Sequence, residues 1–177
     1  MVWRGARYPV GIALATSNLG RAAARAGRPD EAGRLLSEGL AGFEKIGAEN
    51  LALQTRTQIA ENFVFCRQSH SALDLVDETL KGLKAIGGIA FVQAMLFRLR
   101  GCALAQAGDT SAAIDWLEQS LQLAVSVSAQ YEAALTLEAF ALLGARPAGS
   151  ANPTAEAKAI FARLGVVWTP AVPLRAH

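Results

Sequence analysis

Residues 98–121, RLRGCALAQAGDTSAAIDWLEQSL, predict the fold of this chain. They read as one helix, a tight turn at residues 108–110, and a second helix that folds back against the first. Gly101 lies in the first helix, and Ala113 follows twelve residues later in the second. Residues this small indicate that the two helix backbones approach each other closely at these positions.

The same spacing occurs twice upstream, as Gly20 with Ala32 and as Ala60 with Ala72. Ala32, Ala72 and Ala113 are 40 and 41 residues apart, and a recurrent interval of this length is typical of a repeat array. We therefore expect an all-α solenoid of antiparallel helical hairpins with a period of about 40 residues. It would contain three full repeats and a degenerate fourth.

The composition agrees with an all-α chain. Of its 177 residues 52% are hydrophobic and only 7% aromatic, and the strong helix formers Ala and Leu are frequent. The formal net charge of +2 gives no indication of a nucleic acid or a membrane as partner. No apolar run approaches the roughly 18 residues that span a bilayer. We expect a cytoplasmic protein, with Cys66 and Cys102 as two buried free thiols.

The apolar periodicity predicts the helices and their inward faces. The expected helices cover residues 9–26, 30–47, 51–65, 71–86, 130–143 and 154–164, and two further helices are expected within residues 91–128. Their inward residues include Leu14, Leu19, Ala23, Leu36, Phe43, Ile46, Ile59, Val76, Phe91, Leu99, Trp116 and Leu117.

Residues 1–165 form the expected repeat domain, and residues 166–177 form an extended apolar tail packed on the last helices. Pro170 and Pro173 exclude a helix in this tail. Trp168 is expected to be largely buried there. At the other end, Val10, Leu14, Ala22 and Ala26 are expected to leave an apolar face uncovered, through which the first hairpin would contact an upstream domain or a second copy.

The pattern resembles tetratricopeptide repeats. In each of the three repeats a large apolar residue follows the alanine by four positions, as Leu36, Val76 and Leu117. The resemblance covers residues 9–128 well. The period is longer than the usual ~34 residues, and the proline expected near the end of each repeat is absent.

Three further pieces, NLGR at residues 18–21, RLRG at 98–101 and IFARLGV at 160–166, resemble the carboxy-terminal repeats of bacterial proteins that join nucleotide-cyclase and NTPase domains. The chain contains no GxxxxGK[ST] loop for phosphates and no paired metal-binding aspartates in a strand. The chemistry of that family is therefore carried by no residue of this chain, and we expect no catalytic site and no cofactor.

The tetratricopeptide resemblance implies a concave groove lined by the first helix of each hairpin. The groove residues that it implies are Ser17, Asn18, Arg21, Arg25, Gln54, Gln58, Glu61, Met95 and Arg98. Family members that bind a peptide carboxylate use lysines and asparagines at positions that here hold Ser17, Arg21, Gln58, Met95 and Leu99. Arg21 can bind a carboxylate, but the family pattern is not met. Solvated helix faces remain the alternative interpretation.

Other polar residues favour plain structural roles. His70 is expected in a turn, and His177 is the last residue, so neither predicts a metal site. Asp74, Asp77 and Glu78 are interpreted as a solvated helix face. Arg100 occupies an expected inward position. It is either buried and paired, with Glu61 or Glu138 as possible partners, or it extends to the solvent at the edge of the helix pair, and we favour a structural ion pair over a role in ligand binding.

These observations lead to three hypotheses for function. The first is a non-catalytic module for protein–protein interaction that binds a partner segment in the groove, as the carboxy-terminal piece of a larger bacterial signalling protein. The second is a regulatory domain of a nucleotide cyclase or NTPase whose catalytic domains are absent from this chain. The third is a sensor of a small ligand in the groove.

Overall fold

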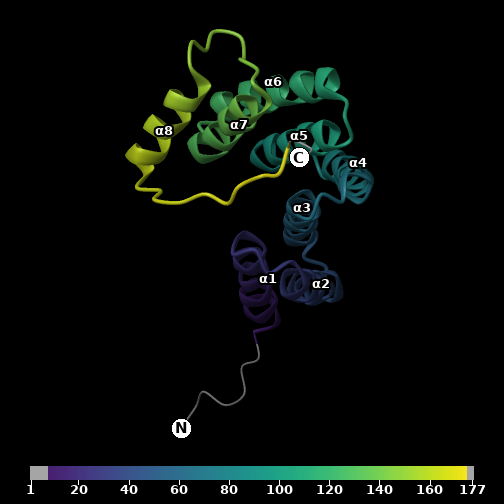
Figure 1. Ribbon diagram of the computed structural model, residues 1–177. Coiled ribbons are helices and arrows are strands. Elements are labelled where there is room, and N and C mark those ends of the chain that lie inside the picture. Colours follow the sequence, from purple (N-terminus) through teal and green to yellow (C-terminus); the bar gives the residue numbers. More distant parts are fainter. Residues whose placement is uncertain (1–7, 175–177) are drawn as a thin grey trace.

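The computed structural model describes residues 8–174, and all regular structure in them is helical (Figure 1). The all-α prediction is confirmed. The eight helices of this part of the chain are α1 (Pro9–Arg25), α2 (Pro29–Lys45), α3 (Glu49–Phe65), α4 (Ser69–Ala85), α5 (Ala90–Gln106), α6 (Thr110–Ser126), α7 (Gln130–Leu143) and α8 (Pro153–Leu164). His177 and the end of the predicted tail lie outside the described residues.

The helices form four hairpins that stack in chain order. Each helix packs on its neighbours in the chain, with the closest association inside the pairs α1–α2, α5–α6 and α7–α8. The helices α1, α3, α5 and α7 also pack in a row, each on the next of the four. Figure 1 shows α1 and α2 at one end and α8 at the other. We call α1, α3, α5 and α7 the inner row.

Short turns with a left-handed residue separate the helices. Glycines take this conformation after α1, α2, α4, α5, α7 and α8. After α3 and α6 the same conformation is taken by Arg67, with φ 58°, and Ser128, with φ 57°. A residue with a Cβ atom adopts it at a cost of about 1–2 kcal/mol, so the packing of the hairpins must impose the turn there.

The helices meet at the small residues of the recurrent spacing. A Cβ atom on Gly101 would lie 2.8 Å from Cγ of Leu117 and 3.0 Å from the carbonyl oxygen of Ala113. A Cβ atom on Gly20 would lie 2.9 Å from the backbone nitrogen of Leu36. The alanines of the same pattern are fully buried, namely Ala32, Ala60, Ala72 and Ala113. The first and third hairpins are therefore closed with no room for one additional methyl group.

Several residues that the periodicity placed in the core are exposed. The side chains of Leu14, Leu19, Ile46 and Phe91 are accessible to solvent, and Leu19 is 61% exposed. Periodicity identifies residues that share a helix face, but burial requires a neighbour to cover that face. In α1 the face that packs on α2 and α3 is instead made of small residues, including Ala13, Ser17 and Ala24.

The tail contacts the helices through its end rather than through its tryptophan. Trp168 is 63% exposed, so the prediction that it is buried is wrong. Leu174 is buried and Val172 half-buried against the main core. The carbonyl oxygen of Pro173 accepts hydrogen bonds from Nε2 of Gln106 (3.2 Å) and from Arg67 (3.3 Å). The tail thus crosses from α8 back to α5, as Figure 1 shows in yellow.

No helix within residues 8–174 is long and apolar enough to cross a membrane. Cys66 and Cys102 are both free thiols. Cys102 is buried, and burial raises its pKa to about 11. Cys66 is only half-buried, so the expectation of two buried thiols is correct for Cys102 alone.

The close approach at Gly101 gives a test of the fold. Gly101→Ala should lower the free energy of unfolding by roughly 1–3 kcal/mol, because its methyl group meets backbone as well as side chain. Gly33→Ala is the matched control, since the nearest atom to its new Cβ would be Nδ2 of Asn62, 4.0 Å away. We expect the free energy of unfolding of this control to rise by about 0.5–1 kcal/mol, because alanine has the higher helix propensity. Equal urea-unfolding curves for the two variants would contradict the close contact.

Candidate functional site

The predicted groove residues lie on the inner row, but most of them are not free surface. Ser17, Glu61, Met95 and Arg98 are buried, and Asn18 is exposed. The remaining four, Arg21, Arg25, Gln54 and Gln58, are half-buried. The interpretation of these positions as solvated helix faces is therefore wrong for the buried members. Whether the set binds a partner stays a prediction.

The inner row brings five charged residues together, which we call the arginine–glutamate cluster: Arg21, Arg25, Glu61, Arg98 and Glu132. Glu61 on α3 is its centre. Its carboxylate lies 3.0 Å from Nη2 of Arg25, 3.4 Å from Nη2 of Arg98 and 3.7 Å from Nε of Arg21. One carboxylate thus receives charged side chains from both α1 and α5.

Arg98 links this centre to α7. Its side chain is only 3% exposed, and its Nε and Nη2 both donate to the carboxylate of Glu132. Burial alone would lower the pKa of the Arg98 guanidinium, but Glu132 and Glu61 hold it well above its ordinary value. A buried guanidinium needs carboxylate partners of this kind, because an unpaired buried charge costs several kcal/mol.

Sequence reasoning missed Glu132, which is buried near the start of α7. The sequence does contain a signal for it, because Glu132 is the one acidic residue in the apolar stretch YEAALTL, residues 131–137. A carboxylate inside such a stretch requires a buried cation as its partner. The hydroxyl of the neighbouring Tyr131 accepts from Nη1 of Arg25 at 2.7 Å, which joins α1 directly to α7.

The cluster carries a surplus of positive charge. It contains three guanidinium groups and two carboxylates. Burial and the nearby Arg25 lower the pKa of Arg21, and its Nε is buried without a hydrogen-bond acceptor. An incoming anion would balance the surplus charge at the exposed part of the Arg21 side chain.

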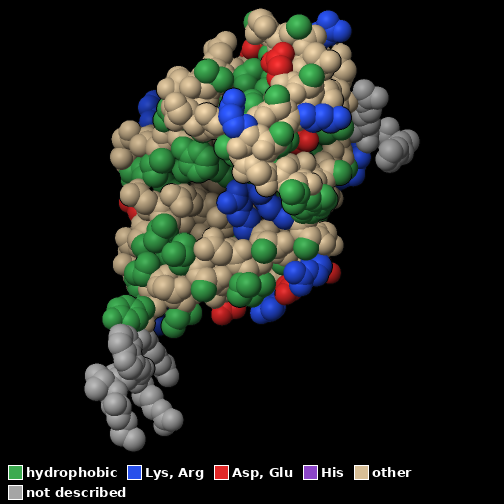
Figure 2. Space-filling view, turned by 90° about the vertical axis from the view of Figure 1, so that its left-hand side faces the viewer, with side chains coloured by type: hydrophobic (Ala, Val, Ile, Leu, Met, Phe, Trp, Pro, Cys, Tyr) green, Lys and Arg blue, Asp and Glu red, His purple; other side chains and the backbone are tan. Residues whose placement is uncertain are grey.

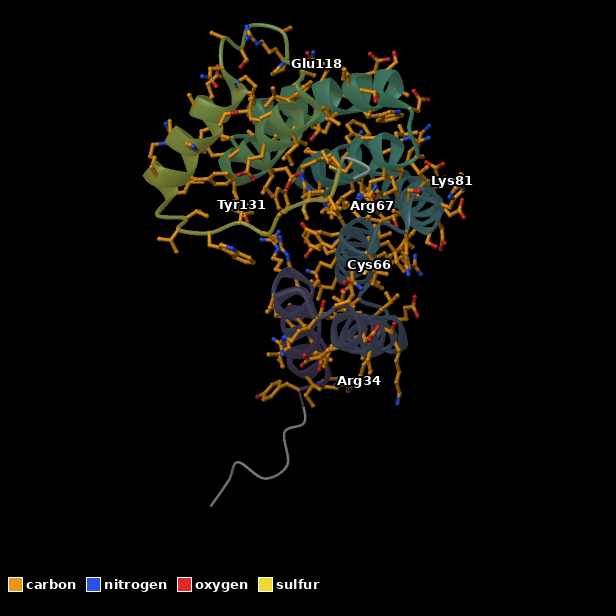
Figure 3. The ribbon with its side chains drawn as sticks, in the orientation of Figure 1. Arg34, Cys66, Arg67, Lys81, Glu118 and Tyr131 are labelled. Atoms are coloured by element: carbon orange, nitrogen blue, oxygen red, sulfur yellow. The ribbon has the colours of Figure 1, made fainter. Side chains whose placement is uncertain are left out.

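A hollow gives access to this charge. Figure 2 views the molecule from the side where α1, α8 and the tail lie, and Lys and Arg side chains gather in a hollow across this face. Arg21 and Arg25 remain 32% and 19% exposed in their side chains. Tyr131 lies above α1 on the same side, next to the tail (Figure 3). Part of each of the two α1 side chains is therefore accessible to a ligand.

Neutral polar groups continue the site along α1 and α3. The hydroxyl of Ser17 donates to Oε1 of Gln58 at 2.8 Å and lies 3.1 Å from the hydroxyl of Thr55. A small cavity of about 60 Å³ beside them is lined by Arg21, Gln58, Met95 and their neighbours. These groups can donate to or accept from a ligand's polar atoms next to the charged part of the site.

The remaining candidates form no second site of this kind. Arg100 forms the predicted ion pair, but its partner is Asp77 on α4 and not Glu61 or Glu138, and its guanidinium carbon lies 4.5 Å from the ring centroid of Trp116. Asp77 keeps 45% of its side chain exposed while it pairs with Arg100, and Asp74 and Glu78 are exposed, so this helix face is solvated as predicted. His70 is exposed. Among residues 8–174 no group of three or more His, Cys, Asp or Glu side chains could hold a metal ion.

Comparison with known proteins assigns no family: no family model, curated protein or solved structure matches the chain. The function must therefore be argued from the site itself. Its chemistry is that of anion binding, because its free capacity consists of hydrogen-bond donors with positive charge.

The buried carboxylate of Glu61 makes stability depend on pH. Burial raises its pKa, but the guanidiniums of Arg98, Arg25 and Arg21 outweigh this and hold the pKa below its ordinary value. A lowered carboxyl pKa stabilises the fold above the ordinary value of about 4.3, and this contribution is lost as the pH falls through the folded pKa. Glu61→Gln should therefore cost roughly 3 kcal/mol at pH 7 and less at pH 3.

Urea unfolding of wild type and variant at the two pH values measures this difference. Glu78→Gln is the control, because Glu78 is exposed and its nearest cation, Nη1 of Arg56, is 3.9 Å away. We expect this control to change the free energy of unfolding by less than about 0.5 kcal/mol. A Glu61→Gln deficit of the same size at pH 3 and pH 7 would contradict a charged Glu61.

Proposed function

We propose that the chain is a tetratricopeptide-type solenoid that acts as a non-catalytic interaction module and binds an acidic segment of a partner protein on the inner row. The observation that carries the proposal is the surplus guanidinium of the arginine–glutamate cluster, together with the 32% of the Arg21 side chain that stays exposed. A carboxylate is the protein group that matches it best, because a guanidinium can donate two parallel hydrogen bonds to it.

The surroundings of Arg21 suit an extended peptide. Its neighbours Gln54 and Gln58 are half-buried amides, which can pair with the N–H and C=O groups of a bound backbone. Asn18 is exposed and lies three residues before Arg21 on the same helix, so it can extend the contact. The inner row thus offers one charged anchor and several neutral polar groups to a partner segment.

A fluorescein-labelled peptide of seven glutamates tests this proposal. Fluorescence anisotropy should show binding at 50 mM salt that weakens as the salt rises, since the attraction is partly screened. Arg21→Gln should reduce the affinity roughly tenfold, the equivalent of one charge-assisted hydrogen bond. A peptide of seven lysines should not bind.

Arg34→Gln is the matched control. Arg34 lies on the outer side of α2, 3.8 Å from Glu38, and far from the hollow (Figure 3). This variant removes the same charge from the chain but should bind the peptide like wild type. Equal losses in Arg21→Gln and Arg34→Gln would mean that the peptide senses net charge only, and the proposed site would be wrong.

The second candidate is a regulatory domain that works joined to a further domain or a second copy. The observation that favours it is the set of exposed apolar side chains on α1 and its N-cap, namely Tyr8, Val10, Ile12, Leu14 and Leu19. Hydrophobic side chains are visible over this part of the molecule in Figure 2. Exposed apolar side chains of this kind usually mark an interface, and a preceding hairpin would pack on this helix.

Sedimentation velocity at tens of micromolar tests association through these side chains. If a second copy of the chain covers these apolar side chains, wild type should dimerise. Leu19→Glu should then be monomeric, because the new charge would be buried in the interface. Val125→Glu is the control, since Val125 is similarly exposed, at 64%, but lies on α6. A monomeric wild type would exclude the second copy.

A further inference from the structure

A second cavity, separate from the hollow, lies between α5, α7, α8 and the tail. We call it the tail pocket. Its volume is about 410 Å³, within the range of roughly 300–1,000 Å³ that is usual for small-molecule sites. Leu135, Ala139 and Leu142 of α7 contribute apolar wall, and Pro170 and Val172 of the tail close another side. The tail therefore encloses a space in which an apolar group would be largely removed from water.

One carboxylate faces this apolar space. Glu138 on α7 lines the tail pocket and is half-buried. It accepts a hydrogen bond from the hydroxyl of Thr169 at 3.3 Å, and no cation within residues 8–174 forms an ion pair with it. Burial raises the pKa of this carboxyl, against the smaller opposing effects of Thr169 and Arg98. Its charge is thus only partly compensated.

The two cations near the tail pocket leave this charge unmatched. Arg98 lines the pocket, but its guanidinium is directed to Glu132 and Glu61. Lys158 on α8 also lines it and is exposed. The pocket therefore combines apolar walls with one negatively charged hydrogen-bond acceptor, the carboxylate of Glu138. Such an arrangement can orient an amphipathic cation.

We propose that the tail pocket binds a small amine, with its hydrocarbon or aromatic body against the α7 and tail walls and its protonated amino group donating to the carboxylate of Glu138. This site is distinct from the proposed partner surface and does not depend on it. The bound amine would supply the counter-charge that Glu138 lacks. It would also exclude water from the apolar walls, which adds a hydrophobic contribution in proportion to the buried area.

Three probes of nearly equal size test the proposal by calorimetric titration: 2-phenylethylamine, 2-phenylethanol and 3-phenylpropionate. The amine should bind at least roughly tenfold more tightly than the alcohol, because only it forms a charge-assisted hydrogen bond. The propionate should bind most weakly, since its charge is repelled by Glu138. Amide NMR shifts should locate the amine, with the largest changes at Ala139, Thr169 and Ala171.

Variants separate the role of Glu138 from that of the cavity. Glu138→Gln should abolish the preference for the amine, whereas Glu78→Gln, a distant exposed carboxylate, should leave it unchanged. Lys158→Gln should bind the amine at least as tightly as wild type, because a like charge is removed. If Glu138→Gln fails to fold, the order of the three probes on wild type and on Lys158→Gln still decides. No amine binding at millimolar concentration, equal binding of the three probes, or amine shifts away from the tail pocket would overturn the proposal.

Discussion

The buried guanidinium of Arg98 is the interaction on which the arrangement of the inner row depends. With 3% of its side chain exposed, it must be paired inside the protein, and its partners Glu61 and Glu132 come from the helices on either side of α5. Its pairing therefore restrains α3, α5 and α7 relative to one another. Glu61 extends the same restraint to α1 through Arg25. Apolar packing builds each hairpin, but this charge network sets how successive hairpins face each other.

The helices and their pairing could be predicted from sequence because both are encoded locally. The periodicity and the small residues Gly101 and Ala113 describe contacts between segments that adjoin in the chain. Burial of a particular face is not local. Leu19 belongs to an apolar stripe but is exposed, and Trp168 is exposed in the tail between the end of α8 and Leu174, which packs on the main core. These errors have one cause, which is that composition identifies apolar residues but not their neighbours.

The members of the arginine–glutamate cluster were predictable in part, and their pairing was not. The tetratricopeptide resemblance implied that Arg21, Arg25, Glu61 and Arg98 line one groove, and the structure brings these four side chains together. That they bind a partner stays a prediction. The sequence did not indicate that they are paired, because the acid that completes the set, Glu132, lies in the degenerate fourth repeat outside the recurrent pattern. Such a partner becomes visible only when a lone carboxylate in an apolar helix is taken to require a buried cation.

Arg98 also explains why the two neighbouring sites differ in their unmatched charge. Its side chain belongs to the arginine–glutamate cluster and also lines the tail pocket, beside Glu138 and Lys158. Both of its carboxylate partners lie on the cluster side, so its charge is used there together with those of Arg21 and Arg25. The cluster consequently has one guanidinium more than it has carboxylates, whereas no guanidinium pairs with Glu138. A single rearranged arginine would neutralise both sites. Its two strong pairings with Glu132 and Glu61 prevent this and keep one site suited to anions and the other to cations.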